Sequence, residues 1–384
     1  MSLRTRFRKL PILYPALSAV RMKAGALYMR LCHAIFGVDR STALFSSYNG
    51  RGYSDNPQPV SEALHALRPD LKIVWEFQRG CIPDDLPDYI RPIPAHSLKA
   101  VRAFATTGVI VCNNNRAHYM LKFPGQIYVQ TWHGDRGFKK VLLDLHPDDD
   151  VPDGAQMDLA VSGSRFGSQV YRSSMGYDGE ILEVGCPRND ALVCHTPADV
   201  AAARSALDIP PETRVLLYAP TFRQAERGRV QHAPLDLDAV RRHLEAVTGQ
   251  RWLGLTRAHG HARAIEANGQ RDVSQWPSIN ELLLVTDLLI TDYSSVGGDF
   301  MLLNRPVIYF QPDRDAYHRE RSLYFDPDAS PLKVAHSESE LMELLSHPFD
   351  AEENCREVLD YFGTRETGRA AQAVAERIVV LMNS

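Results

Sequence analysis

Two neighbouring hydroxyl residues, Ser294 and Ser295, stand where a short apolar run gives way to an expected helix. The start of a helix leaves backbone N–H groups unpaired and carries the positive end of the helix dipole, so it favours an anion. Serine hydroxyls beside these groups could bind phosphate oxygens. Asp292 and the two serines could instead only cap the helix, a common use of these residue types. This stretch alone leaves both interpretations open.

Cationic side chains follow other apolar runs of the chain. His133 precedes a glycine, and a histidine with an ordinary pKa near 6.5 can take a proton from an attacking hydroxyl at neutral pH. Arg223 and Arg257 could each make paired hydrogen bonds to phosphate oxygens. A charged His259 could neutralise a leaving phosphate, and His261 competes with it for that role. The alternatives are a histidine hydrogen-bonded at a domain interface and surface salt bridges for the arginines.

The serine pair belongs to a strand–turn–helix–strand unit. Residues 288–291 predict a buried strand, 296–303 a helix that ends at Arg305, and 307–310 a second strand. The same alternation covers the chain from residue 42 onwards and predicts parallel sheets with right-handed crossovers. The other expected strands are 43–48, 71–77, 108–112, 126–131, 157–162, 180–184, 214–219 and 252–255, and the expected helices include 97–105, 235–247, 279–285, 338–345 and 366–382.

Polar segments follow five of these strands. Parallel α/β sheets bind ligands at the carboxyl ends of their strands. We therefore expect the five segments to converge on one cleft between two sheets, with residues 195–211 as the hinge. The segments are 50–52, 132–134, 221–223, 257–259 and 292–295.

The composition is that of a globular protein with roughly two domains, since 384 residues exceed one ordinary core. A formal net charge of -4 gives no argument for nucleic acid as a partner. The six cysteines show no metal-ligand spacing and are typical of reduced thiols in a cytoplasmic protein. Motifs of serine hydrolases, P-loop proteins, zincins and dinucleotide enzymes are missing from the sequence. We expect neither a metal site nor a cofactor.

The first forty residues differ from the rest. Residues 1–38 contain seven basic residues and no acidic one, interleaved with apolar side chains. Pro11 and Pro15 interrupt the apolar run and Arg21 follows it, which is not typical of a signal peptide, and the run is too short to span a bilayer. The segment could lie on an anionic membrane surface. The alternative is a helical arm packed on the protein's own surface.

Several motifs, in this order, resemble those of the CDP-glycerol glycerophosphotransferase family of teichoic-acid and capsule polymerases. The likeness covers roughly residues 45–345, so chance agreement is remote although each motif alone is weak. The motifs are TWHG at 131–134, YAPTFR at 218–223, TRAH at 256–259, ITDYSSVGGDF at 290–300 and RPVIYFQPD at 305–313.

The resemblance implies a GT-B type α/β fold with two Rossmann-like parallel-sheet domains facing a central cleft. We expect a basic arm at 1–40, an acceptor-side domain at 41–205, and a CDP-donor domain at 206–384 whose last helix could reach back to the first. The family transfers an alditol phosphate, here most simply glycerol phosphate, from CDP-glycerol or CDP-ribitol to a hydroxyl of a lipid-linked or polymeric glycan acceptor. It releases CMP without a metal, at the inner face of the cell membrane.

The resemblance also implies roles for individual residues. His133 is similar to the family's proposed base and His259 to its second essential histidine, while Ser295 and Asp299 match donor-site positions. Four further residues are expected at the donor because they lie beside these motifs. They are Thr221, Arg223, Arg257 and Ser294.

The chain departs from the family pattern at three places. After the TWHG motif, residues 135–138 (Asp-Arg-Gly-Phe) precede Lys139, where the family usually has a threonine and a hydrophobic residue before the lysine. Gly297-Gly298 replace bulkier residues, for which close approach of the donor is the expected reason, and Ala329-Ser330-Pro331 replace a Pro-Gly-Pro of the family. Two other functions would suit the same features. One is a GT-B glycosyltransferase that uses a sugar nucleotide, and the other is a membrane-surface scaffold without activity.

Overall fold

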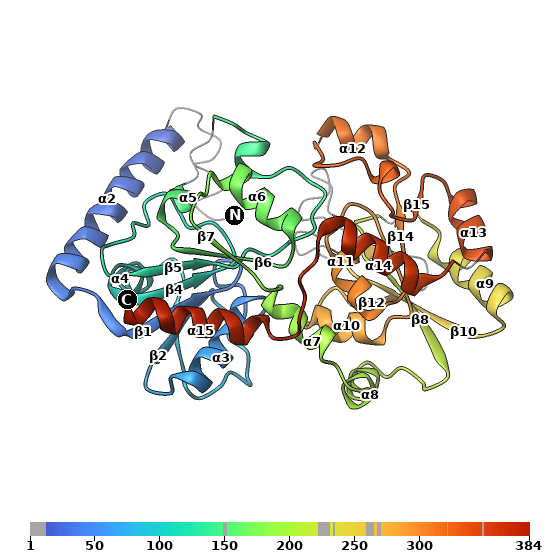
Figure 1. Ribbon diagram of the computed structural model, residues 1–384, viewed down its shortest axis with the longest axis horizontal. Helices are drawn as coiled ribbons and strands as arrows, with labels where there is room; N and C mark the ends of the chain where they lie inside the picture. Colours follow the sequence, from blue (N-terminus) through green and yellow to red (C-terminus); the bar gives the residue numbers. More distant parts are fainter. Residues whose placement is uncertain are drawn as a thin grey trace.

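Two parallel sheets lie side by side in the computed structural model (Figure 1). The described residues are 13–148, 152–221, 231–232, 235–258, 265–266, 270–320, 322–347 and 349–384. Three residues considered above, Arg223, His259 and His261, lie outside the described residues.

The first sheet has seven parallel strands in the order β3-β2-β1-β4-β5-β6-β7. They are β1 Asp39–Ser46, β2 Lys72–Phe77, β3 Ile90–Pro94, β4 Thr107–Cys112, β5 Ile127–Gln130, β6 Leu159–Ser162 and β7 Glu180–Glu183. Six of them were expected. The sequence analysis missed β3, because its two prolines disfavour a strand unless it lies at the edge of a sheet, where β3 indeed lies.

Helices cover both faces of this sheet (Figure 1). They are α2 Leu13–Phe36, α3 Pro57–Leu67, α4 Leu98–Thr106, α5 Pro152–Gln156, α6 Arg165–Met175 and α15 Ala370–Asn383. One hydrophobic cluster joins α2, α4 and α6 to one face, and another joins α3 and α15 to the opposite face. The last helix of the chain therefore packs on the first sheet.

The second sheet has six parallel strands in the order β12-β10-β8-β13-β14-β15. They are β8 Thr213–Tyr218, β10 Arg251–Thr256, β12 Arg271–Asp272, β13 Leu288–Thr291, β14 Val307–Phe310 and β15 Val334–Ala335, and β9 Gln231–His232 pairs separately with β11 Ile265–Glu266. The helices of this part are α7 Asp190–Val193, α8 Pro197–Ala206, α9 Leu237–Thr248, α10 Ile279–Val285, α11 Val296–Phe300, α12 Arg314–Glu320, α13 Glu338–Ser346 and α14 Ala351–Phe362.

The strand–turn–helix–strand unit around the serines is confirmed as β13, α11 and β14. Its helix is shorter than expected, because α11 ends at Phe300 and continues as a single 3₁₀ turn, Met301–Leu303. Asn304, in the left-handed conformation at φ 54°, ends that turn. Helix α14 falls where the sequence predicted none, as do the shorter helices α5, α7 and α12.

The described part of the amino-terminal arm is the long helix α2, which has two different faces. Met29 and Cys32 are buried against the first domain, and His33 stacks on Phe123 with ring centroids 4.2 Å apart. The opposite face exposes the apolar side chains of Val20, Leu27, Leu31 and Ile35 to solvent, and Met22 and Phe36 are exposed near the two ends of the helix. In the part of the chain that the structure describes, no helix has the length and apolar character needed to cross a membrane.

Candidate functional site

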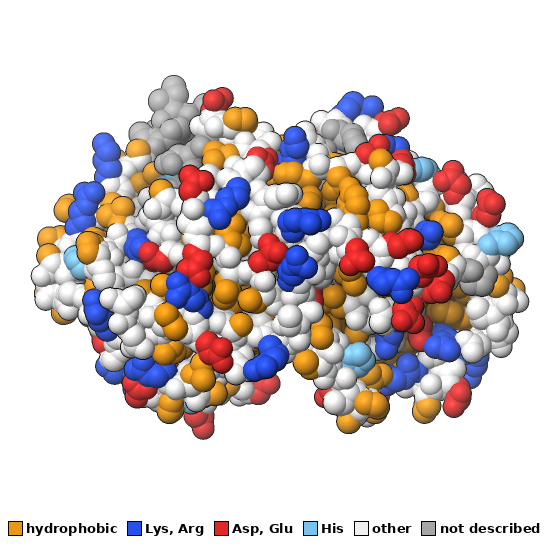
Figure 2. Space-filling view, in the orientation of Figure 1, with side chains coloured by type: hydrophobic (Ala, Val, Ile, Leu, Met, Phe, Trp, Pro, Cys, Tyr) orange, Lys and Arg blue, Asp and Glu red, His pale blue; other side chains and the backbone are white. Residues whose placement is uncertain are grey.

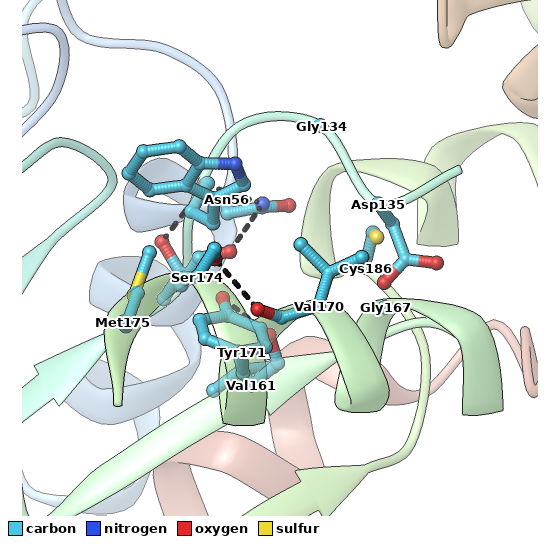
Figure 3. Close-up of a pocket in the computed structure, with 12 residues that line it drawn as sticks. Asn56, Gly134, Asp135, Val161, Gly167, Val170, Tyr171, Ser174, Met175 and Cys186 are labelled. Carbon is cyan, nitrogen blue, oxygen red and sulfur yellow. Dashed lines mark hydrogen bonds between the residues drawn. The ribbon is translucent and has the colours of Figure 1, made fainter. Parts of the chain in front are cut away.

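The loop after β5 carries His133 and is held in an uncommon conformation. Trp132 has a positive φ of 49°, which is strained for a bulky residue. The Asn56 side-chain amide donates to the carbonyl oxygens of Thr131 and Trp132 at 3.1 and 3.0 Å (Figure 3). Gln130 Oε1 accepts from the Trp132 N–H at 3.0 Å. These contacts place the histidine at a defined position beside the strand end.

The His133 imidazole is oriented by a backbone carbonyl. Its Nδ1 lies 2.6 Å from the carbonyl oxygen of Asn113, the residue that follows β4. A carbonyl can only accept, so Nδ1 carries the proton and Nε2 is the unprotonated nitrogen of the neutral ring. The ring is half-buried beside Tyr48, at a centroid distance of 5.5 Å, and burial lowers its pKa. At pH 7 the ring is thus neutral, and its Nε2 is chemically able to accept a proton.

The serine pair of the second domain lies directly opposite this loop. A Cβ on Gly134 would lie 3.3 Å from Ser295 Oγ, so the 132–134 loop and the start of α11 are in contact. Ser295 makes no side-chain capping bond, and the Ser294 hydroxyl accepts only a long bond of 3.4 Å from the Val296 N–H. Both serines are partly exposed. A pure capping role, the alternative left open above, is therefore not what the Ser295 hydroxyl performs here.

Asp292 and Thr221 join the ends of two strands rather than capping the helix. Asp292 accepts from the backbone N–H of Thr221 at 2.8 Å and from its hydroxyl at 3.0 Å. Asp292 also accepts from the Tyr293 N–H, and the side chains of Asp292 and Thr221 are both buried. This contact connects the carboxyl ends of β8 and β13, next to the loop that carries the two serines.

Arg257 follows β10 and lies on the side of its sheet that faces the first domain. Its NH1 donates to the Trp276 carbonyl oxygen at 2.9 Å. Burial lowers the pKa of this guanidinium, and Tyr48 of the first domain is near enough to act on it electrostatically. The described parts of the five predicted segments thus include His133, Arg257 and the serine pair at facing strand ends.

Asp299, which the sequence predicts at the donor nucleotide, is surrounded by protein groups. Both of its carboxylate oxygens accept hydrogen bonds from them. Its Oδ1 accepts from Arg136 at 2.8 Å and from Asn189 at 2.9 Å, and its Oδ2 accepts from Arg188 at 2.9 Å. Burial opposes ionisation, but the two guanidiniums outweigh it and lower the Asp299 pKa. Asp299 therefore anchors one domain to the other.

Arg136 is the centre of this buried ionic cluster. It is 1% exposed and pairs with Asp299 and with Glu366, which lies between α14 and α15. Burial raises the pKa of Glu366, against the effect of the arginine. From the sequence, Arg136 was noted only as a departure from the family pattern; its partner Glu366, and Arg188, which pairs with the same Asp299, were missed.

Two of the departures from the family pattern, Arg136 and the glycine pair, lie in contact, and this contact explains both. A Cβ on Gly298 would lie 2.9 Å from Arg136 Nε, and a Cβ on Gly297 would collide with the Tyr309 hydroxyl. The glycines thus make room for a buried arginine and a tyrosine of this chain. These contacts account for the glycines without reference to the donor. Paired departures at contacting positions were the available signal for the cluster.

A small cavity lies behind the histidine loop (Figure 3). Its volume is about 20 Å³, and its lining includes Asn56, Trp132, Gly134, Tyr171 and Cys186. That volume holds about one water molecule and no nucleotide. Within the described ranges, no cluster of three or more His, Cys, Asp or Glu side chains is arranged to hold a metal ion.

Two parallel α/β domains with facing strand ends define the GT-B-like class of fold that the sequence predicts. The structure of the wall teichoic acid polymerase TagF is similar over 100% of this chain and 99% of that one, with a TM-score of 0.81 at 26% identity. A variant of TagF soaked with CDPG gives a TM-score of 0.80 at 25% identity. The sequence profile of the CDP-glycerol:poly(glycerophosphate) glycerophosphotransferases matches residues 27–380, so the chain belongs to this family.

Curated relatives agree with this assignment. The teichoic acid poly(glycerol phosphate) polymerase of Staphylococcus epidermidis is 29% identical over 89% of this chain, and that of Bacillus subtilis is 28% identical over 89%. The chain spans about half the length of these two relatives, 51% and 49%. It spans 93% of the teichoic acid glycerol-phosphate transferase of Staphylococcus aureus, at 27% identity. The predicted family and fold are thus confirmed.

Proposed function

We propose that this chain transfers glycerol phosphate from CDP-glycerol to a hydroxyl of a lipid-linked or polymeric glycan acceptor, releasing CMP, in the synthesis of a teichoic-acid-like polymer. The observation that carries the proposal is the family match over residues 27–380. The neutral histidine opposite a pair of hydroxyls supports it, because acid–base and phosphate-binding groups meet at one place. CDP-ribitol is the alternative donor, since a poly(ribitol-phosphate) polymerase is also among the relatives.

The proposed reaction is a single in-line displacement at phosphorus. His133 Nε2 takes the proton of the acceptor hydroxyl, whose oxygen attacks the phosphorus that bears glycerol. The new P–O bond forms as the bond to the bridging pyrophosphate oxygen breaks, and CMP leaves with the electron pair. Arg257 and the hydroxyls of Ser294 and Ser295 stabilise the negative charge, which is the main demand of phosphoryl transfer. The resemblance adds His259 to the groups that hold the leaving phosphate, and Arg223 is expected at the donor because it lies beside a family motif.

Donor turnover tests this proposal. The protein is incubated with CDP-glycerol, CDP-ribitol, and a panel of UDP- and GDP-sugars, each with a lipid-linked acceptor, and the released nucleotide is measured by chromatography. We expect CMP from a CDP-alditol and no UDP or GDP. Release from a sugar nucleotide alone would overturn the proposal in favour of a glycosyltransferase.

We further expect the reaction to need no added divalent cation. In the proposed site, arginine, histidine and hydroxyl groups supply the charge stabilisation that a metal supplies in many other phosphoryl transferases. CMP release should therefore stay within about twofold in excess EDTA, relative to a desalted control. Loss of turnover in EDTA with recovery on adding Mg²⁺ would contradict this expectation.

The outward face of α2 supports a proposal about location. We propose that this face binds an anionic membrane surface on the cytoplasmic side. Basic residues Arg21, Lys23 and Arg30 accompany its exposed apolar side chains, and Figure 2 shows hydrophobic and basic side chains intermixed along the edge where α2 runs. Each basic side chain near such a surface contributes about 1 kcal/mol.

Point substitutions test the membrane proposal more cleanly than deletion of residues 1–38, because deletion would uncover the core beneath Met29 and Cys32. Exchanging Leu27, Leu31 and Ile35 for glutamine should weaken sedimentation with phosphatidylglycerol vesicles by at least about tenfold, since burial of one leucine contributes roughly 1.5 kcal/mol or more. The control replaces three exposed apolar residues elsewhere, Leu67, Ile82 and Val380, and should bind as the wild type does. Equal loss in both triple variants would contradict a specific role for α2.

A further inference from the structure

Asn113 connects the histidine to its surroundings. Its carbonyl oxygen accepts from His133 Nδ1, and its side chain is completely buried. The side-chain Oδ1 accepts from the Tyr48 N–H at 2.8 Å, and the Nδ2 donates to Asp55 Oδ1 at 3.1 Å. The groups that hold the Asn113 side chain therefore also determine where the imidazole points.

Asp55 lies just before α3, and its carboxylate accepts several hydrogen bonds. Its carboxylate accepts from the Tyr48 hydroxyl at 2.7 Å, from the Asn56 N–H at 2.8 Å and from Arg188 at 3.3 Å. Its backbone has a positive φ of 59°, a strained conformation for a residue other than glycine that persists only where the surroundings enforce it. A strained backbone and several hydrogen bonds close to the candidate base indicate that Asp55 has to occupy a defined position.

Arg188 continues this path into the second domain. Its NH2 donates to Asp299 Oδ2 at 2.9 Å, and its carbonyl oxygen accepts from the side chain of Asn280 in α10 at 2.7 Å. Arg188 and Asp55 side chains are each 8% exposed, so water screens their pairing little. A continuous set of contacts thus runs from His133 through Asn113, Asp55 and Arg188 to the domain that carries the serine pair.

We propose that Asp55 and Arg188 are positioning residues for the transfer reaction. They hold the His133 ring with Nε2 free and fix its place relative to Ser294 and Ser295 across the domain interface. This inference rests on the proposed function of His133 as the base. A displacement of about 1 Å at a reacting group costs on the order of 100-fold in rate, so this support is required even though neither residue contacts the reacting atoms.

Kinetics of Asp55→Asn test the proposal. This variant keeps the shape of the side chain and removes its charge. We expect kcat for CMP release to fall by about 10- to 100-fold, while KM for CDP-glycerol changes by less than about twofold. Arg188→Lys, which cannot reach both carboxylates with a planar fork, should lie between wild type and Asp55→Asn. Asp287→Asn is the control, because Asp287 also pairs with an arginine and a backbone N–H, but at the opposite end of the second sheet.

A double variant separates positioning from simple loss of stability. In the His133→Ala background, Asp55→Asn should lower the residual rate by less than about twofold, because the group that it positions has gone. A further loss as large as that in the wild-type background would overturn the proposal. If Asp55→Asn does not fold, Asn113→Ala replaces it in the same cycle, since it keeps the carbonyl but removes the side chain that Asp55 and Tyr48 hold.

A structural readout keeps this inference separate from the proposed function. If the wild type releases no CMP from any CDP-alditol, the function fails, and crystal structures of the wild type and of Asp55→Asn decide the positioning claim. We expect the His133 ring to leave the Asn113 carbonyl in the variant. An unchanged ring with the 2.6 Å contact intact would refute the positioning role.

Discussion

Replacing His133 by alanine should lower CMP release from CDP-glycerol by about two to four orders of magnitude, the usual contribution of a positioned general base. The expected cause is loss of the proton acceptor, because Nδ1 is already bonded to the Asn113 carbonyl and Nε2 is the nitrogen left to take a proton. KM for CDP-glycerol should change little, since the histidine acts on the acceptor hydroxyl. The rate is measured as CMP formed with a lipid-linked acceptor present in excess.

His195→Ala is a matched control for this experiment. His195 makes the same kind of contact, with its Nδ1 2.6 Å from the Leu192 carbonyl oxygen, but it follows α7 rather than a strand end of the first sheet. Its removal should leave CMP release within about twofold of the wild type. Wild-type rates in His133→Ala, or equal losses in both variants, would remove His133 from the role of base.

The pH dependence of the wild type should agree with this assignment. A base acts in its deprotonated form, and burial lowers the pKa of His133 below its ordinary value near 6.5. CMP release should therefore stay on a plateau through neutral pH and fall only as the pH drops below that value. In His133→Ala this acidic limb should be absent. A wild-type limb centred above pH 7 would contradict a neutral, partly buried histidine as the base.

Replacing Arg136 by methionine should lower the free energy of unfolding by about 3–5 kcal/mol, the usual result of removing one partner from a buried ion pair. The substitution keeps most of the volume but leaves Asp299 and Glu366 buried without their shared guanidinium. Arg136 also connects the first domain to the second and to the segment before α15. Unfolding is followed by urea titration at pH 7 with fluorescence and circular dichroism.

Low pH should reduce the difference in the free energy of unfolding between the wild type and Arg136→Met. Arg188 and Arg136 lower the pKa of Asp299, so the stability that this carboxylate contributes is present above its ordinary pKa and is lost as the pH falls through the folded-state value. The gap between wild type and Arg136→Met should be full at pH 7 and shrink below about pH 4. The control is Arg377→Met, whose exposed pair with Glu180 at 2.7 Å is screened by water and should contribute little to stability. Equal losses in the two variants would refute the importance of the buried cluster.

The alternation of apolar and polar residues predicted the fold well, because each strand and helix is largely a local decision. Strands β13 and β14 have the predicted bounds, and Ser97 and Ser164 cap helices that begin one residue later. The exceptions have physical reasons. Strand β3 contains two prolines at a sheet edge, and α11 ends early, where the chain changes to a 3₁₀ turn.

The candidate site was predictable only in part. Four of the predicted residues follow strands: His133, Arg257, Ser294 and Ser295. Because parallel strands bring their carboxyl ends to one edge of a sheet, the position of these residues in the sequence was enough to place them at the facing strand ends. Asp299 shows the limit of this reasoning. Its place one turn into a helix is compatible with a ligand or with a domain anchor, and only the partners Arg136, Arg188 and Asn189 show that it is an anchor.

The sequence by itself determined the two parallel sheets, the family, and the residue types that stand at the strand ends, because these depend on local periodicity and short motifs. Only the tertiary structure decided which residues, distant in the chain, form hydrogen bonds or ion pairs with one another. Asn113 beside His133, Asp55 beside Arg188, and Arg136 beside Gly298 are contacts between segments far apart in the chain. Such contacts depend on strand order and on the docking of two domains, which no local pattern encodes.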